Sequence, residues 1–331
     1  MGNQIALTGI KPSGTPHIGN YLGMIRPALE LAKKYQALYF IADYHALTTV
    51  KDGKELKELT YEVAATWLAL GLDPEKVIFY RQSDIPEVME LAWILACFTP
   101  KGLLNRAHAY KAAVEENLAM GEGPDEGINA GLFFYPVLMA ADILLFGTHY
   151  VPVGLDQKQH LEIARDIAQA FNNNYGNILT IPEAVIREDV MTITGIDGRK
   201  MSKSYDNVIP IFAPPDKLRK VVMRIVTDSR RPEEPKDPDQ DNLFSIYRYF
   251  ASPQDQERIR QRYLSGGLAY SEVKNELYEL LLEQFGPARQ KYEEYLNDKS
   301  YLEEVLSRGA EKARKMATPL MEKVRAAIGV D

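Results

Sequence analysis

The stretch Ile5-Ala6-Leu7-Thr8-Gly9-Ile10-Lys11-Pro12-Ser13-Gly14-Thr15-Pro16-His17-Ile18-Gly19-Asn20 decides the fold class of this chain. Its apolar start predicts a buried strand over 5–9, and a helix is expected over about 17–34 after a loop of small residues and proline. In a parallel sheet, ligands collect beyond the carboxyl ends of the strands, where helix N-termini present free N–H groups. This turn is therefore a candidate ligand site, although a simple helix-capping turn explains the same residues equally well.

Apolar runs and amphipathic runs alternate through the first two-thirds of the sequence. Further strands are expected over 38–43, 77–80 and 148–153, and further helices over 54–70 and 157–171. This alternation is typical of βαβ units around a parallel sheet. After about Ser204 only helical patterns continue, over 270–285, 288–296 and 301–328. We therefore expect an α/β fold with a Rossmann-type catalytic domain over 1–204 and an all-helical domain over 205–331, whose last helix is a candidate to pack back on the first domain.

Composition narrows the class of protein. The formal net charge of -7 argues against binding nucleic acid by bulk charge, so any RNA contact should be local. The single cysteine, Cys97, stands in an apolar run and is expected to be buried, which leaves no internal disulfide. No spacing of His, Cys or acidic residues suggests a site for a tightly bound metal. The start lacks the layout of an export signal and no apolar run is long enough for a membrane helix, so we expect a cytoplasmic protein.

A second motif, Asp197-Gly198-Arg199-Lys200-Met201-Ser202-Lys203-Ser204, lies where the strand pattern ends. Two ammonium groups on a flexible loop can follow a pyrophosphate as charge builds on it, although an ordinary solvated basic turn has the same composition. Between the two motifs, a polar, glycine-bearing stretch at about 111–130 interrupts the pattern. We interpret it as a mobile surface insertion.

Taken together, HIGN at 17–20 and KMSKS at 200–204 resemble the two signatures of class I aminoacyl-tRNA synthetases. The segments 8–14, 43–48, 135–144, 151–160 and 308–313 resemble the tryptophanyl branch of that family, of the bacterial type. The resemblance implies an enzyme that activates L-tryptophan with ATP and Mg²⁺ to tryptophanyl-adenylate and pyrophosphate. The acyl group would then pass to the 3′-terminal ribose of tRNA(Trp), and a homodimer is implied.

The resemblance also assigns roles to individual residues. It implies catalytic roles for His17, Asn20, Lys200 and Lys203. The residues implied to bind ATP lie on the two signature loops or near strand ends between them: Lys11, Pro12, Ser13, Gly19, Asn20, Gly154, Leu155, Asp156, Val190, Lys200, Met201, Ser202, Lys203 and Ser204. The residues implied to bind tryptophan line one pocket: Leu7, His45, Tyr135, Met139, Asp142, Val151, Val153 and Gln157. Lys111 is implied as a further phosphate contact.

Asp142 is the residue on which the choice of amino acid depends. It stands in an apolar helical pattern in which Tyr135 and Met139 on composition alone fit a helix core, so its carboxylate needs a hydrogen-bond donor. The donor implied by the resemblance is the indole N–H of tryptophan, and phenylalanine would leave the carboxylate unpaired. Three alternatives remain open: the tyrosyl enzyme, which shares both signatures, a small-molecule nucleotidyltransferase of the same superfamily, and a non-catalytic tRNA-binding paralogue.

Overall fold

One parallel sheet forms the centre of the computed structural model, which describes residues 4–12, 14, 16–153, 158–186 and 193–330. The strands of the described residues pair in the order β3-β2-β1-β4-β5, and each pairing is parallel. They are β1 Ile5–Ile10, β2 Gln36–Ile41, β3 Ile78–Arg81, β4 Tyr150–Val153 and β5 Glu183–Ile186. The predicted α/β, Rossmann-type fold is confirmed, and so are the four strands expected from the sequence. The sequence pattern missed β5, whose four residues are too few to show a period.

The sheet is buried on both faces, as parallel sheets are. Successive side chains of a strand point to opposite faces, so those of β2 divide between two hydrophobic clusters. Tyr39 and Ile41 pack into a cluster with α4, Gly53–Ala69, whereas Leu38 and Phe40 pack into one with α8, Ala130–Leu144. This explains why β2 reads as a continuous apolar run.

Short and long helices connect the strands. The helix expected over 17–34 consists of α1 Ile18–Asn20, a π-helical turn η1 Tyr21–Ile25 and α2 Arg26–Leu31. The remaining helices up to β5 are α3 Asp43–Ala46, α4 Gly53–Ala69, η2 Gln82–Asp84, α5 Pro86–Ala96, α6 Lys101–Leu104, α7 His108–Ala119, α8 Ala130–Leu144 and α9 Lys158–Tyr175. Those after β5 are η4 Lys203–Tyr205, α10 Pro215–Met223, α11 Asn242–Tyr247, α12 Pro253–Ser265, α13 Tyr270–Asn297 and α14 Lys299–Ile328.

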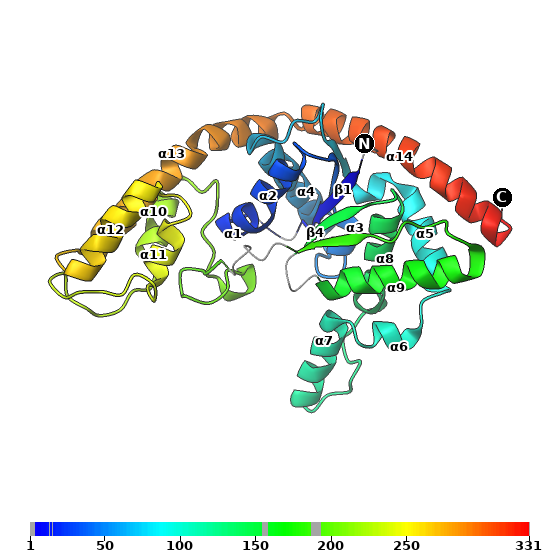
Figure 1. Ribbon diagram of the computed structural model, residues 1–331, viewed down its shortest axis with the longest axis horizontal. Helices are drawn as coiled ribbons and strands as arrows, with labels where there is room; N and C mark the ends of the chain where they lie inside the picture. Colours follow the sequence, from blue (N-terminus) through cyan, green and yellow to red (C-terminus); the bar gives the residue numbers. More distant parts are fainter. Residues whose placement is uncertain (1–3, 13, 15, 154–157, 187–192, 331) are drawn as a thin grey trace.

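The helices after the sheet form an arm and an arch (Figure 1). The arm contains α10, α11 and α12, and the arch, formed by α13 and α14, runs from the arm over the sheet. α14 packs directly on β3: a Cβ on Gly309 would lie 1.8 Å from the carbonyl oxygen of Phe79, so only glycine fits there. Arg81 of β3 adds a two-pronged ion pair with Glu303, at 2.8 Å for each pair of atoms. The last helix therefore covers the edge of the sheet that β3 would otherwise expose.

Two local expectations from the sequence need correction. The helices expected over 270–285 and 288–296 are one continuous helix, α13, with Pro287 inside it. The stretch at 111–130 lies on the surface and contains the second half of α7, and Asn117 donates hydrogen bonds to two carbonyl groups of the turn that follows; its mobility stays a prediction. Cys97 is exposed rather than buried, since it follows the outer face of α5, where Trp93 is 71% exposed.

None of the helices in the described part of the chain combines the length and the apolar character needed to cross a membrane.

Candidate active site

The first signature forms a tight turn at the carboxyl end of β1. His17 is the N-cap residue of α1, and its backbone N–H donates to Asn20 Oδ1 at 3.0 Å. The imidazole is buried, and its Nδ1 has no hydrogen-bond partner among the described residues. Burial, followed by the charge of Lys203, lowers the pKa of His17 to about 4. The side chain is therefore neutral at physiological pH, and its Nδ1 is a buried polar atom without a partner among the described residues.

The second signature loop reaches the first one directly. Lys203 Nζ donates a hydrogen bond to the carbonyl oxygen of Gly14 at 2.5 Å. Gly14 has a φ of +112°, which glycine adopts without strain. A Cβ there would lie 3.2 Å from Lys203 Cδ, so the missing side chain also leaves room for the lysine. A Cβ on Gly19 would lie 3.2 Å from the sulfur of Met201, which is itself buried. Two motifs far apart in the sequence thus contact each other at the mouth of the sheet.

Asn207, which the sequence analysis did not single out, holds the second loop in shape. Its Oδ1 accepts the N–H of Ser202 at 2.8 Å, and its Nδ2 donates to Asp197 Oδ1 at 2.7 Å and to the carbonyl of Lys200 at 3.0 Å. A Cβ on Gly195 would lie 2.4 Å from Asn207 Cγ, so the loop leaves room for this side chain. Asn207 stands three residues beyond the signature, and its buried position has no local sequence signal.

The other residues expected at the nucleotide end differ in how far they are buried. Lys11 Nζ donates to Thr48 Oγ1 at 2.9 Å, and burial lowers the pKa of Lys11. Lys200 and Ser204 stand on the exposed side of the second loop, and Pro12 is buried. Several expected contacts lie outside the described residues: Ser13, Gly154, Leu155, Asp156, Gln157 and Val190.

Asp142 is the centre of a hydrogen-bonded group at the amino-acid end. It belongs to α8 and is 2% exposed. His45 Nε2 lies 2.9 Å from Asp142 Oδ2, and Gln82 Nε2 donates to Oδ1 at 2.8 Å and to Oδ2 at 2.9 Å. Burial raises the pKa of Asp142, while the hydrogen bonds from His45 and Gln82 oppose that rise. The donor that this buried carboxylate requires is present, and Gln82, which follows β3, was not predicted.

Apolar and aromatic side chains surround this group. Leu7 and Val151 are buried in the same hydrophobic cluster as α8, and Met139 packs against that cluster. Tyr135 lies edge-on to His45 with ring centroids 6.3 Å apart, and its hydroxyl lies 2.5 Å from His160 Nε2. His160 is buried on α9. Of the residues expected to bind tryptophan, Tyr135, His45 and Asp142 are therefore neighbours. Val153 is described only as the last residue of β4.

Lys111 lies on the exposed surface of α7, where its Nζ is 3.6 Å from Glu115 Oε1. Its phosphate contact stays a prediction.

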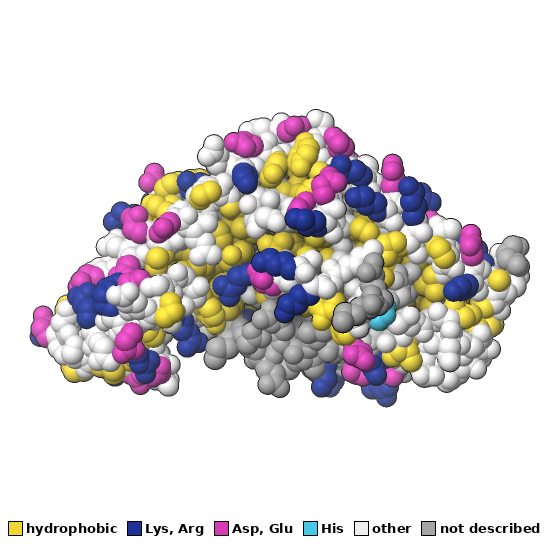
Figure 2. Space-filling view, turned by 45° about the horizontal axis from the view of Figure 1, so that its top comes forward, with side chains coloured by type: hydrophobic (Ala, Val, Ile, Leu, Met, Phe, Trp, Pro, Cys, Tyr) yellow, Lys and Arg dark blue, Asp and Glu magenta, His cyan; other side chains and the backbone are white. Residues whose placement is uncertain are grey.

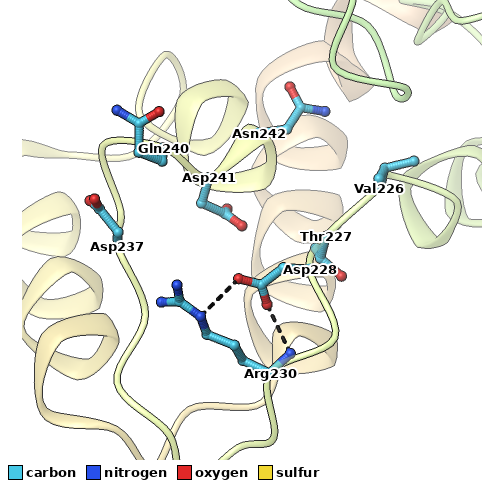
Figure 3. A pocket seen from close by; sticks show the side chains of 8 residues that line it. All are labelled: Val226, Thr227, Asp228, Arg230, Asp237, Gln240, Asp241 and Asn242. Carbon is cyan, nitrogen blue, oxygen red and sulfur yellow. Dashed lines mark hydrogen bonds and ion pairs between the residues drawn. The ribbon is translucent and has the colours of Figure 1, made fainter.

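A polar pocket of about 290 Å³ lies in the loop between α10 and α11 (Figure 3). Arg230 and Asp228 form an ion pair across it at 3.3 Å. Two hydrogen bonds join this region to the base of the second signature loop: Val226 N–H donates to Ile196 O at 2.7 Å, and Asn242 Nδ2 donates to Gly195 O at 2.9 Å. The arm and the KMSKS loop are thus directly connected.

The charged side chains on the surface are mixed in sign. Figure 2 shows Lys and Arg side chains side by side near the middle of the face drawn, with both signs over the rest of that face. Three basic residues of the helical part hold contacts within the chain: Lys274 and Arg289 donate to backbone carbonyls, and Arg314 pairs with Glu87 at 3.0 Å. Within the described ranges, no three His, Cys, Asp or Glu side chains form a group that could hold a metal ion.

Comparisons with known proteins place this geometry in a family context. Residues 2–286 match a family model described as tRNA synthetases class I (W and Y). The chain is 53% identical to the tryptophan–tRNA ligase of Pseudomonas aeruginosa over 329 residues, which cover 98% of this chain and 73% of that protein. It is also 53% identical to the tryptophan–tRNA ligase of Bordetella pertussis over 332 residues, 99% of this chain and 73% of that protein.

Solved structures of the same family are similar to this chain over nearly its whole length. The tryptophanyl-tRNA synthetase of Campylobacter jejuni, complexed with ADP and tryptophan, superposes with a TM-score of 0.90 at 49% identity, covering 98% of this chain and 100% of that one. The enzyme of Mycoplasma pneumoniae superposes with a TM-score of 0.82 at 30% identity, covering 99% of this chain and 98% of that one.

Proposed function

The chain belongs to the class I tRNA synthetases for tryptophan and tyrosine, and from this premise we propose that it is a tryptophan–tRNA ligase. It activates L-tryptophan with ATP and transfers the product to tRNA(Trp). The observation that carries the choice of tryptophan is Asp142, a buried carboxylate held by His45 and Gln82 beside an apolar wall. A buried acceptor of this kind suits a flat, apolar ring with one N–H donor.

In the first step, the carboxylate of tryptophan attacks the α-phosphorus of ATP and pyrophosphate leaves. The carboxylate is already a nucleophile, so no strong general base is needed and positioning together with charge stabilisation carries the rate. We assign Lys200 and Lys203 to the charge that develops on the phosphates. The contact of Lys203 with Gly14 supports this role, because it places an ammonium group between the two signature loops.

The first signature supplies the other phosphate contacts. We assign His17, Asn20 and Lys11 to the ATP phosphates, and the buried, neutral imidazole of His17 supports a role as a hydrogen-bond donor from one ring nitrogen. Gly19 allows a flat base to approach the backbone, and Met201 packs above it. Mg²⁺ is proposed to accompany ATP, since its preferred ligands are oxygen atoms and the phosphates provide them.

At the amino-acid end, we assign the wall of the pocket to Leu7, Tyr135, Met139 and Val151, with Val153 and Gln157 as further contacts. Tyrosine is the rival substrate, because the tyrosine enzymes share the family. Its hydroxyl could also donate to Asp142, so the fit of the larger indole against this wall decides between them.

The helical part after residue 204 is proposed to bind tRNA. The hydrogen bonds from Val226 and Asn242 to the base of the KMSKS loop support a link between tRNA binding and the active site. In the second step, the acyl group passes to the 3′-terminal ribose, where the 2′-hydroxyl is the expected acceptor.

A homodimer is proposed as the working form, and the cytoplasm, where ATP and tRNA are present, as the location. The outer face of α5 supports the dimer: Met89 and Trp93, one helical turn apart, are 43% and 71% exposed. An apolar strip of this kind gains free energy when a second copy covers it.

ATP–pyrophosphate exchange with a panel of amino acids tests the proposal. Exchange should depend on tryptophan, with tyrosine lower and with phenylalanine, which has no donor for Asp142, lower by about three or more orders of magnitude in kcat/KM. Charging of tRNA(Trp) with labelled tryptophan then tests the second step. Exchange that depends on tyrosine would replace the proposed substrate, and no exchange with any amino acid would leave only a tRNA-binding protein.

A further inference from the structure

Gln82 is the most deeply buried polar side chain near the amino-acid pocket. It is 0% exposed and stands on η2, directly after β3 at the carboxyl end of the sheet. Its amide oxygen accepts the backbone N–H of His45 at 3.4 Å. That contact turns the NH₂ group of Gln82 toward Asp142. Gln82 therefore connects the end of β3 with α3 and α8.

The hydrogen bonds of Asp142 leave little of its acceptor capacity free. An ionised carboxylate has about four acceptor positions, two on each oxygen. Contacts with the described residues fill three: Gln82 Nε2 lies 2.8 Å from Oδ1 and 2.9 Å from Oδ2, and His45 Nε2 lies 2.9 Å from Oδ2. One position remains, on Oδ1, and it can only accept a hydrogen bond.

We propose that Gln82 is a positioning residue for substrate selection, because its amide donates to both oxygens of Asp142 and directs the last acceptor position of Oδ1 to the indole N–H. Gln82 acts through Asp142 and needs no contact with the substrate. The inference rests on the proposed function, since it concerns how the same pocket selects tryptophan.

The charges around Asp142 explain why an amide is needed. His45 and Asp43 face Asp142 from α3, and Tyr80 faces it from β3. His160, on α9, contacts the hydroxyl of Tyr135. Burial raises the pKa of Asp142, and the negative charge of Asp43 raises it as well. Hydrogen bonds from His45 and Gln82 lower the pKa. Without the amide, the carboxyl group would hold its proton to higher pH and would present a donor where an acceptor is required.

Gln82→Met tests this role, since methionine is similar in length but cannot donate a hydrogen bond. The readout is pyrophosphate exchange with tryptophan and with the analogue that carries sulfur in place of the indole N–H. The ratio of the two kcat/KM values should fall by roughly ten- to a hundredfold relative to the parent chain, the range for a lost hydrogen bond to a charged group, while the KM for ATP stays the same. The ratio should recover as the pH rises, because the carboxyl group of Asp142 then ionises without help.

Gln82→Glu gives an independent test if Gln82→Met does not fold, because it keeps the shape of the side chain. The two neighbouring carboxyl groups then share one proton, and Glu donates to Asp142 only while it holds that proton. Tryptophan kcat/KM relative to the parent should therefore fall as the pH rises, the opposite trend to Gln82→Met. A purely structural role predicts the same pH dependence for both variants and would overturn the proposal.

Gln169→Met is the matched control, because it makes the same change at an exposed glutamine of α9 whose amide donates to Asn173. It should leave the ratio between tryptophan and the sulfur analogue unchanged. An equal loss in Gln169→Met would assign the effect to the substitution itself and overturn the role of Gln82. A parent chain with no tryptophan-dependent exchange would overturn the proposed function itself, whereas normal exchange in the parent with unaltered Gln82 variants would overturn only the inference.

Discussion

The two ends of the candidate site are built in different ways. At the amino-acid end, Asp142 and Gln82 are fully buried side chains that hydrogen-bond to each other. At the nucleotide end, Lys11 and Lys203 are only half-buried, and each holds one short contact with a protein oxygen.

This difference in burial suits two different tasks, which are selection of the amino acid at one end and catalysis at the phosphates at the other. A rigid, hydrogen-bonded pocket rejects a substrate that lacks the matching donor, because the rejected complex leaves a buried charge unpaired. Phosphates change their charge during the reaction, and half-buried cations with few contacts can adjust to them. The role proposed for Lys203 requires its ammonium group, which has three donors, to reach a phosphate from its present contact with the carbonyl oxygen of Gly14.

The largest effect is expected at the amino-acid end. Asp142→Ala should lower kcat/KM for tryptophan by about a thousandfold or more, because the indole N–H loses its buried acceptor, and should leave the KM for ATP within about twofold. Steady-state pyrophosphate exchange measures both values. Asp216→Ala, which removes an exposed carboxylate from α10, is the control. An unchanged kcat/KM for tryptophan would refute the pocket assignment.

The nucleotide end should show its effect in rate rather than affinity. Lys203→Ala should slow adenylate formation by about a hundredfold, while the Kd values of ATP and tryptophan change by less than about threefold. Single-turnover kinetics separate these quantities. Lys76→Ala, at an exposed lysine on another surface, should match the parent. If only the affinity for ATP changed, Lys203 would be a ground-state contact and the distinction between the two ends would be lost.

A smaller effect is expected from the residue that shapes the second loop. Asn207→Ala removes the hydrogen bonds that join Ser202, Asp197 and Lys200, so kcat should fall by about tenfold with little change in the KM for tryptophan. The exposed Asn173→Ala on α9 serves as the comparison. An equal loss in kcat for both variants, or a loss confined to the tryptophan KM, would contradict a role in loop geometry.

The smallest effect concerns stability and pH. The pKa of His17 is about 4 in the folded chain, below the ordinary value of 6.5, so the unfolded chain binds the extra proton between these values. Stability should therefore be complete above about pH 6.5 and decrease as the pH falls toward 4. Urea unfolding of the parent and of His17→Gln at pH 7 and pH 4.5 measures this, and the parent should lose about 1–2 kcal/mol more than the variant. Equal losses would mean that His17 is already solvated.

Local pattern explains why most of the fold was predictable. The strand at 5–9 and the helix at 301–328 have a clear period, and the structure contains both. β5 and the continuity of α13 depend on tertiary packing, which cannot be predicted from a short stretch of sequence. Cys97 was expected to be buried because its neighbours are apolar, yet it faces away from the core at the end of α5.

The candidate site was predictable where a motif carries it. His17 and Lys203 stand in recognisable signatures, and the structure brings these two loops together. Gln82 and Asn207 have no such signal, because an amide side chain in a polar turn looks like any surface residue until the partner it bonds to is known. The apolar surroundings of Asp142 predicted that its carboxylate needs a hydrogen-bond donor, but they did not indicate that Gln82 is one.

The position of α14 on β3 has a consequence for how the chain folds as it is made. Arg81 and Glu303, which form the ion pair between these elements, are 222 residues apart. During synthesis, the edge of β3 therefore stays uncovered until α14 has left the ribosome and can pack on it. Contacts over such a distance slow folding, and an unpaired strand edge is prone to aggregate in the meantime. We expect the sheet to complete its packing only after α14 has been synthesised, and the chain to depend on chaperones until then.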